Sequence, residues 1–297
     1  MNFRHLKIFI TVCEEKNMTK AAKKLFISQP SVSQAIAEME EYYQVKLFER
    51  LSRKIYLTKA GEELLSYAYH LVALNQKMEE VARKNERRQT VVLGATVTIG
   101  TYILPGLLSE IKECHDGLEI KTIVENTKLI EEGILSSRLD LGLVEGGINS
   151  VDLEVKPFSE NELVLICHKD HPLAQKNTIT LQDLQDQPFF LREEGSGSRA
   201  LFLDAMKKRG MPVKIQGEFN NTEGIKIATK YNLGLGVVSE ITLFRDDHDL
   251  VILPVEDLSL TRHFSLVYHK DKYISRDLAW LMEYIKANGG SQVRSVS

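Results

Sequence analysis

The sequence predicts an α/β protein that carries a small, basic, all-helical head at its N-terminus. The chain has 297 residues, a length that is typical of about two domains. Residues 1–58 contain ten lysines and arginines against six glutamates, whereas the remaining residues contain 28 basic and 35 acidic side chains. Strand-like and helical patterns alternate only after residue 90. A basic head on an acidic body indicates that the head alone has a polyanionic partner.

Three short helices are expected in the head. Asn17 and Ser28 are good N-caps for the second and third of these helices, and Pro30 is tolerated in a first helical turn. Residues 3–14 and the segments after each cap show apolar side chains at helical spacing. We therefore expect Cys13 to be a core residue. The apolar stripes comprise Leu6, Phe9, Ile10 and Cys13, then Ala21, Ala22, Leu25 and Phe26, then Val32, Ile36, Met39 and Tyr43.

The second and third helices are joined by a tight turn, and the third is polar at its start. This arrangement is typical of a helix-turn-helix, in which the first turns of the recognition helix reach base edges in the major groove. Glutamine can bond adenine with both amide atoms, and serine can contact bases or phosphates. The alternative is an ordinary three-helix core with a solvated polar face. The expected DNA contacts from this helix are Ser28, Gln29, Pro30, Ser31, Ser33 and Gln34.

A two-stranded hairpin is expected to follow, over residues 47–58. Ser52, Arg53 and Lys54 would form its turn, and Ile55 and Leu57 begin an alternating pattern. A basic hairpin tip beside a recognition helix is well placed for phosphates or the adjacent minor groove. The candidate contacts here are Arg50, Arg53 and Lys54.

Residues 18–61 resemble the winged helix-turn-helix of LysR-type transcriptional regulators. The match has several parts in a fixed order, and the total chain length also fits that family. Gln34 stands where the family often has arginine, so base preference at that point differs from the usual pattern. The matching segments are Ala21-Ala22, Leu25, Ser28-Gln29-Pro30-Ser31-Val32-Ser33, Ile36, Leu47-Phe48-Glu49-Arg50 and Leu57-Thr58-x-Ala60-Gly61.

A long linker helix is expected over residues 59–88, with Thr58 as its N-cap. Its apolar positions alternate spacings of four and three for about three heptads, and the pattern ends in a charged stretch at residues 83–88. Packing against its own chain is possible, but no second long helix is near in sequence. The resemblance implies that such helices pair two protomers. The heptad positions are Ala60, Leu64, Tyr67, Leu71, Leu74, Met78 and Val81.

The rest of the chain alternates strands with helices, which indicates parallel sheets. The expected strands are residues 91–95, 118–124, 139–144, 163–168, 188–191, 213–219, 236–239, 251–253 and 263–269. The expected helices are residues 102–114, 128–137, 198–209, 223–231 and 276–287.

The resemblance implies a particular division of this α/β part, which periodicity alone does not give. In the family, two lobes form a cleft like that of periplasmic binding proteins. We therefore expect a DNA-binding domain at 1–58, a linker at 59–88 and an effector-binding domain at 89–297. Within the last, lobe one would comprise about 91–161 and 266–290, and lobe two about 162–265.

Small polar residues follow several of the expected strands, where ligands bind in open α/β sheets. Hydroxyls, backbone N–H groups and helix N-termini in one cleft suit a small carboxylate or inorganic anion as co-inducer. For any single residue, helix capping is the simpler explanation, but the resemblance matches this set to pocket-forming positions. The expected effector contacts are Thr96, Thr98, Ile99, Asn126, Thr127, Glu145, Ser196, Ser198, Arg199, Asn221 and Thr222.

No motif indicates an enzyme. The glycine-containing loops match neither a phosphate-binding loop nor a nucleophile elbow. His168 and His171 lack a third ligand, so no metal site or catalytic residue is expected. Trp280 is expected to be a packing residue.

Two other classes of protein are considered. A transporter's solute-binding protein would need a signal peptide, which we do not find. No apolar segment is long enough to span a membrane. An enzyme that uses the cleft would need a catalytic constellation. The expected protein is thus a cytosolic, effector-sensing regulator. Its expected partners are double-stranded operator DNA, RNA polymerase and further copies of itself in a dimer or tetramer.

Overall fold

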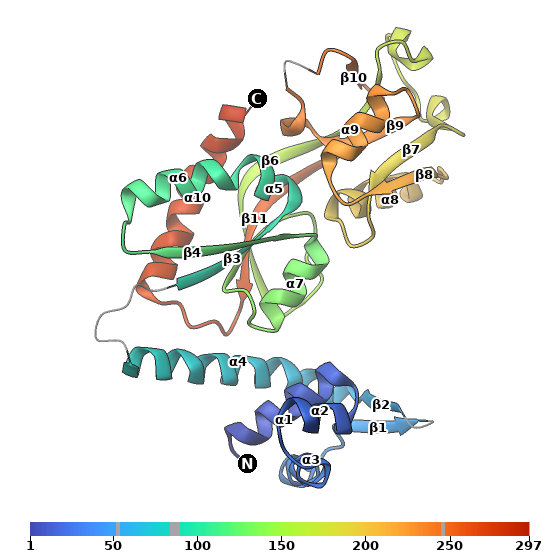
Figure 1. Ribbon diagram of the computed structural model, residues 1–297. Coiled ribbons are helices and arrows are strands. Elements are labelled where there is room, and N and C mark those ends of the chain that lie inside the picture. Colours follow the sequence, from blue (N-terminus) through green and yellow to red (C-terminus); the bar gives the residue numbers. More distant parts are fainter. Residues whose placement is uncertain (52–53, 84–89, 245–246, 297) are drawn as a thin grey trace. The chain divides into compact units, whose positions relative to one another are not determined.

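The fold is described from a computed structural model, in which residues 1–51, 54–83, 90–244 and 247–296 are described (Figure 1). The chain divides into two compact units. One consists of Met1–Arg87 with Leu135–Ser137, and the other of Arg88–Ile134 with Arg138–Ser297.

The first unit begins with the helical head that the sequence predicts. Asn17 accepts hydrogen bonds from two amides of the second helix, and Ser28 Oγ accepts from Ser31 N at 3.3 Å, so both expected N-caps are confirmed. Cys13 is buried in the core of the head, and this burial raises the pKa of its thiol to about 12. The elements are α1 (Phe3–Glu15), α2 (Met18–Lys24), α3 (Gln29–Tyr43) and the antiparallel strands β1 (Phe48–Leu51) and β2 (Lys54–Leu57).

The long helix α4 (Lys59–Arg83) has two apolar faces. Thr58 Oγ1 accepts from Gly61 N at 3.0 Å, as expected for its N-cap. One face packs on the core of the head through Leu64, Leu65, Ala68, Tyr69 and Val72. The other face leaves large side chains exposed, namely Tyr67, Leu71, Leu74 and Met78. Packing within the chain therefore uses one face of α4 and leaves most of the predicted heptad stripe uncovered.

The second unit is built on nine strands in the order β4-β3-β5-β11-β6-β9-β7-β8, with β10 paired to β6. Strands β3, β4 and β5 are parallel in one lobe, and β7, β8 and β9 are parallel in the other. The strands are β3 (Thr90–Thr96), β4 (Glu119–Glu125), β5 (Leu141–Glu145), β6 (Leu153–His168), β7 (Pro188–Arg192), β8 (Lys214–Phe219), β9 (Leu235–Ser239), β10 (Leu250–Leu253) and β11 (Thr261–His269).

Two long antiparallel strands, β6 and β11, connect the lobes. They pair along the whole of β11, from Thr261 opposite Glu162 to His269 opposite Leu153. The N-terminal part of β6 and β11 extend the sheet of lobe one, whereas the C-terminal part of β6 pairs with β9 and β10 in lobe two. Figure 1 shows both strands running from one lobe to the other. The crossing of these strands places the hinge between the lobes near residues 161–163 and 261–262.

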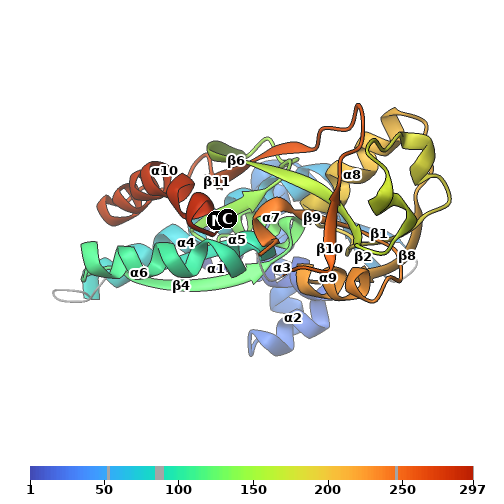
Figure 2. The same cartoon turned by 90° about the horizontal axis from the view of Figure 1, so that it is seen from above.

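Helices cover the sheets of both lobes. In lobe one, α6 and α10 contribute to one buried core and lie side by side in Figure 2. Trp280 packs against that core, as expected, with its ring 4.6 Å from that of His115. The α-helices are α5 (Val97–Tyr102), α6 (Leu104–Cys114), α7 (Thr127–Leu135), α8 (Gly197–Lys208), α9 (Thr222–Lys230) and α10 (Arg276–Val296). Short 3-10 helices are η1 (Pro172–Gln175), η2 (Leu181–Leu184) and η3 (Glu240–Thr242).

Several elements differ from the sequence prediction, among them α5, β6 and α10, which ends at Val296 and not at residue 287. Residues 97–101, expected in a loop, belong to the short helix α5. Strand β6 has 16 residues and begins at Leu153, whereas only its apolar end at 163–168 was predicted. The missed part is polar because both of its faces are only partly covered.

Candidate DNA-binding face and effector cleft

The start of α3 presents a polar, solvent-exposed surface. Ser28, Gln29, Pro30, Ser31 and Gln34 are exposed and Ser33 is half-buried, so the fold brings all six predicted contacts from this helix to one end of it. Two of the side chains bond one another, since the hydroxyls of Ser28 and Ser31 lie 2.8 Å apart. Gln34 donates to Glu38 at 2.8 Å. Only Val32 in this stretch is fully buried, which fixes the helix on the core and turns the polar groups outward.

The predicted contacts in the hairpin are only partly within the described chain. Arg53 lies outside the described residues. Arg50 in β1 and Lys54 in β2 have described backbones, in neighbouring rungs at the turn end of the two-stranded ladder, but not described side chains. The hairpin itself agrees with the prediction.

Several predicted effector contacts lie at or just after the carboxyl ends of the parallel strands. Thr96 ends β3, the middle one of the three parallel strands of lobe one, and is also the N-cap residue of α5. Its side chain is 2% exposed, and its hydroxyl has no hydrogen-bond partner among the described residues. Thr98, on the first turn of α5, is equally buried. Such an orphaned hydroxyl is costly unless something else bonds it.

Several predicted effector contacts cap helices or hold the lobes together in the chain without ligand. Asn126 accepts from Leu129 N at 3.1 Å and Asn221 accepts from Gly224 N at 2.7 Å, so each caps a helix. Thr127 Oγ1 donates to the carbonyl of Glu145 and accepts from Gly197 N at 3.2 Å. Thr222 is buried at the start of α9. Ser196, the N-cap residue of α8, makes no capping bond and is 4% exposed.

One predicted contact is a core residue. Ile99 is fully buried in the hydrophobic core of lobe one, together with residues of α6 and β11. Its side chain therefore stabilises lobe one, and the role of Ile99 as an effector contact stays a prediction.

A buried arginine joins the lobes at the crossing strands. Arg262 Nη2 lies 2.5 Å from Glu145 Oε2, and Nη1 donates to Ser198 Oγ at 2.8 Å. Its Nε donates to Asn161 on β6, which also accepts from Ser239. Burial lowers the pKa of Arg262, and the Glu145 carboxylate opposes that effect. Glu145 and Ser198 are therefore already engaged in the hinge.

Two more arginines line lobe two, and each has its own carboxylate. Arg192, 3% exposed at the end of β7, binds both oxygens of Glu193 at 2.8 and 3.0 Å. Arg199 lies 2.6 Å from Glu218 and donates to the carbonyl of Arg192. The predicted effector contact Arg199 thus carries a paired charge.

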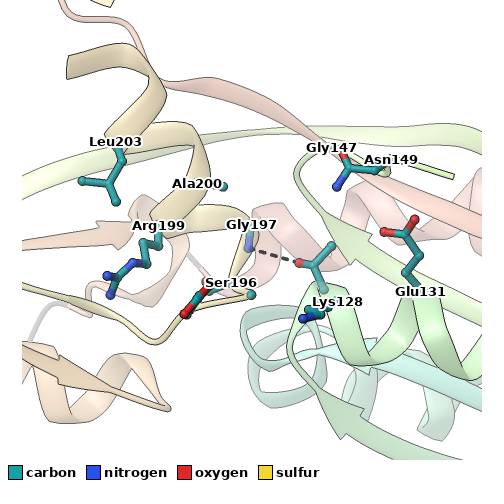
Figure 3. Close-up of a pocket in the computed structure, with 12 residues that line it drawn as sticks. Lys128, Glu131, Gly147, Asn149, Ser196, Gly197, Arg199, Ala200 and Leu203 are labelled. Atoms are coloured by element: carbon teal, nitrogen blue, oxygen red, sulfur yellow. Dashed lines mark hydrogen bonds between the residues drawn. The ribbon is translucent and has the colours of Figure 1, made fainter. Parts of the chain in front are cut away.

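A cavity of about 320 Å³ lies where α7 of lobe one meets the start of α8 in lobe two (Figure 3). Thr127, Ser196 and Arg199 from the predicted set line it, with Lys128 and Glu131 on the α7 side. The dashed bond in Figure 3 joins Gly197 N to Thr127, so the two lobes are in direct contact at its edge.

Sequence reasoning missed Arg192, Arg262 and Tyr102. A signal existed for Arg262, because it shares one face of β11 with the buried Phe264 and Leu266. A charged side chain on a buried face needs a partner. Tyr102 carried no such signal, since its partner Glu223 is 121 residues away.

No group of three or more metal-ligating side chains occurs in the described part of the chain. Both histidines considered above have structural roles. His168 Nδ1 and His171 Nδ1 each accept a backbone N–H in the turn that follows β6. Among the described residues, no helix is long and apolar enough to cross a membrane.

The fold and these two surfaces define a regulator with a DNA-binding head and a ligand-binding body. Comparison with known proteins gives the family. Residues 3–62 match the model of the bacterial regulatory helix-turn-helix proteins of the lysR family, and residues 84–290 match the LysR substrate binding domain. The chain belongs to the LysR family of transcriptional regulators and, like its named relatives, acts as a regulator and not as an enzyme.

Relatives match over nearly the whole chain. The transcriptional regulator CysL of Bacillus subtilis is 33% identical, over 99% of both chains. The transcriptional activator CmpR of Synechocystis is 30% identical, over 95% of this chain and 94% of that protein.

Two solved structures show the same architecture. The regulatory domain of Synechocystis CcmR, solved in complex with 2-PG, is 29% identical with a TM-score of 0.62, and the match covers 67% of this chain and 96% of that domain. Full-length OxyR of Pseudomonas aeruginosa, at 22% identity, shares the fold with a TM-score of 0.66 over 99% of this chain and 97% of its own.

Proposed function

We propose that this regulator binds a small carboxylate or phosphate anion between its two lobes and that binding changes how its head engages operator DNA. The buried hydroxyl of Thr96 carries this proposal. It lies at the carboxyl end of β3, the middle parallel strand of lobe one, where ligands bind in such sheets, and lacks a partner within the described residues. A ligand oxygen at this position would satisfy it.

Donors other than arginine are expected to hold the anion. The three arginines near the cleft are each paired with a carboxylate, in the pairs Arg192–Glu193, Arg199–Glu218 and Arg262–Glu145. Hydroxyl groups, the N-terminus of α8 and the ammonium group of Lys128, which lines the cavity, remain as donors, and helix N-termini favour anions. The 29% identical CcmR domain was solved with 2-PG (2-phosphoglycolate), which is a small anion of this kind.

Thr96→Val tests the effector site. The change keeps the shape of the side chain and removes the hydroxyl, so affinity for an anionic effector should fall about 10- to 150-fold, the usual cost of losing a hydrogen bond to a charged group. Thr101→Val is the control, because Thr101 is exposed on the same helix. Calorimetry with 2-phosphoglycolate, inorganic phosphate and small carboxylates on the full chain gives the affinities. Equal affinity in Thr96→Val and the wild type would place the site elsewhere.

We propose the following division of labour along the chain. Residues 1–58 read the operator, residues 59–88 link and pair two protomers, and residues 89–297 bind the effector. Support for the first assignment comes from the exposed polar start of α3. The predicted contacts Arg50, Arg53 and Lys54 would add phosphate binding from the hairpin.

Gln29→Ala tests the recognition helix. Loss of this amide should reduce the free-energy difference between specific and nonspecific DNA binding by about 1–3 kcal/mol. Salt-sensitive nonspecific binding should remain. Gln76→Ala, on an exposed position of α4, is the control. An unchanged ratio in an electrophoretic shift titration would contradict the role of Gln29.

Pairing through α4 would set two heads about one turn of DNA apart or a multiple of it. A change in the lobes could then alter head spacing and DNA bending, which is costly and so sensitive to geometry. RNA polymerase is the proposed recipient of this signal at the promoter.

A further inference from the structure

A tyrosine bridges the two lobes on the side formed by α5 and α9. Tyr102 is the last residue of α5, in lobe one, and its hydroxyl donates to Glu223 Oε1 at a distance of 2.5 Å. Glu223 lies in the first turn of α9, in lobe two. The two residues are far apart in sequence and come from different lobes, so this hydrogen bond exists only while the lobes are together.

Lobe two holds Glu223 in place for this contact. Lys226 Nζ lies 3.2 Å from Glu223 Oε1 and 2.8 Å from Asp247 Oδ2, and it donates to the carbonyl of Thr242. The Lys226 side chain is buried, at 2% exposure, and its ammonium lies 5.0 Å from the ring centroid of Phe244. These interactions lie within lobe two, so they hold the Glu223 carboxylate in position to accept the hydrogen bond from Tyr102.

Tyr102 also contacts lobe two through its ring. The ring centroids of Tyr102 and Phe244 are 5.7 Å apart. Burial and then the Glu223 carboxylate raise the pKa of Tyr102, so the phenol stays protonated and remains a donor at any physiological pH. A hydrogen bond to a charged carboxylate is stronger than one between two neutral groups.

The same two helices carry residues of the proposed effector site. Helix α5 has only six residues and begins after Thr96, so Thr96 and Tyr102 lie at its two ends. Glu223 immediately follows Thr222 at the start of α9. Because Tyr102 and Glu223 are already bonded in the chain without ligand, their hydrogen bond holds Thr96 and Thr222 in place for an effector.

The contact differs from the one at the hinge. Arg262 joins the lobes from β11, where the crossing strands leave little room for separation. Tyr102 is on neither crossing strand, and its hydrogen bond requires α5 and α9 to stay together. Ile241 of η3, also in lobe two, is buried in the core of lobe one close to α5, so the hydrogen bond adds to apolar packing between the lobes.

We propose that Tyr102 and Glu223 form a latch that closes the lobes and that Tyr102 is a positioning residue for the effector. The proposal rests on the proposed function in one respect, namely that the effector binds between the lobes. The latch itself is a property of the chain without ligand and can be tested alone.

Hydrogen exchange of the full-length protein without ligand tests the latch. In Tyr102→Phe, amides of both α5 and α9 should exchange about tenfold faster or more, because the ring remains and only the inter-lobe hydrogen bond is lost. Tyr231→Phe is the matched control, since Tyr231 is 76% exposed at the end of α9. Exchange within twofold of wild type in both helices would overturn the proposal, as would acceleration confined to α5.

A double-mutant cycle separates the pair from local packing. Glu223→Ala should also speed exchange in both helices, and adding Tyr102→Phe to it should have little further effect. Strictly additive effects would mean that the residues do not act as a pair and would contradict the latch.

Titration with 2-phosphoglycolate tests the link to the effector. We expect Tyr102→Phe to bind this probe several-fold more weakly than wild type, and Tyr231→Phe to bind equally well. Equal affinity in Tyr102→Phe would overturn its role as a positioning residue. Failure of the wild type to bind 2-phosphoglycolate or inorganic phosphate would instead count against the proposed effector class, and the exchange data would still decide on the latch.

Discussion

Phe26 shows how a single residue can be strained by the turn that the fold requires. It lies between α2 and α3 with a positive φ of 55°, and its side chain is 95% exposed. Its backbone N–H and that of Ile27 bond back to Lys23 and Ala22, which closes the turn. The positive φ of Phe26 is needed to close the turn, and its aromatic ring stays exposed and adds no buried apolar surface.

Phe26→Gly should therefore stabilise the head. Glycine adopts a positive φ without strain, so the substitution relieves about 1–2 kcal/mol of backbone strain. Glycine also loses more chain entropy on folding, so the net increase in the free energy of unfolding should be about 0.5–1 kcal/mol. Ala37→Gly, at an exposed position inside α3, should instead cost about 1 kcal/mol. Hydrogen exchange of α1–α3 under increasing urea measures both changes. A less stable head in Phe26→Gly would show that the aromatic ring makes a contact worth more than the strain.

Asp247 makes the stability of lobe two depend on pH. Burial pushes its pKa up, but hydrogen bonds from Lys226 and Lys230 outweigh burial and hold the pKa at about 2. The folded value is thus below that of the unfolded chain, which is about 3.9. The contribution of Asp247 to the free energy of unfolding is complete at pH values above its pKa in the unfolded chain, and it is lost as the pH falls toward 2.

Asp247→Asn should destabilise lobe two by about 3 kcal/mol or more at pH 7, because the buried Lys226 loses its main counter-charge. The difference from wild type should shrink steadily as the pH is lowered below 4. Asp249→Asn is a useful control, since Asp249 pairs with Lys169 at the surface, where such pairs contribute less than about 1 kcal/mol. Chemical unfolding of each variant at several pH values gives the comparison, and a deficit that did not depend on pH would rule out the charge as its cause.

Helix α4 is the element whose sequence pattern has two uses. The stripe that includes Ala68 and Val72 packs on the head, while the heptad stripe that includes Leu71 and Leu74 stays exposed at 43% and 42%. An exposed row of large apolar side chains on a long helix indicates a partner helix.

Leu71→Asp should break that assembly. The charge would be buried against its symmetry mate, at a cost of several kcal/mol, enough to dissociate a micromolar dimer. Gln76→Asp introduces the same charge off the stripe and should leave assembly intact. Light scattering of the full chain should show the mass halved in the first variant only. Wild-type mass for Leu71→Asp would exclude the heptad stripe as the interface.

Local signals made the head predictable from sequence, and long-range pairing limited prediction in the body. The caps at Asn17, Ser28 and Thr58 act within three residues, so the sequence around them suffices. The first part of β6 has no apolar pattern, because a strand shared by two lobes is only partly covered, and it was missed. Arg262 carried a local signal, a charge on the buried face of β11, but its partners Ser198 and Glu145 are 64 and 117 residues away and could not be identified from the sequence.

At the scale of the whole molecule, the two lobes approach one another closely at a glycine. Gly197 begins α8, and a Cβ built there would lie 2.1 Å from the carbonyl oxygen of Glu145 and 3.0 Å from Thr127 Oγ1, both in lobe one. Next to it, Lys128 N donates to the carbonyl of Gly195 at 3.2 Å, so an amide of lobe one is protected by lobe two. Only a residue without a side chain allows this approach.

Gly197→Ala should therefore hold the lobes apart without unfolding either of them. The backbone of Glu145 cannot yield by the ångström or so that a methyl group needs, whereas rotation about the crossing strands can supply it. We expect the Lys128 amide to exchange with solvent about tenfold faster or more and affinity for the effector to fall, while the melting temperature of the head is unchanged. Gly147→Ala is the control on the same side of the molecule, since a Cβ there would meet nothing within 4 Å. If the Lys128 amide stayed as protected in Gly197→Ala as in Gly147→Ala, the close approach at Gly197 could not be what limits closure of the cleft.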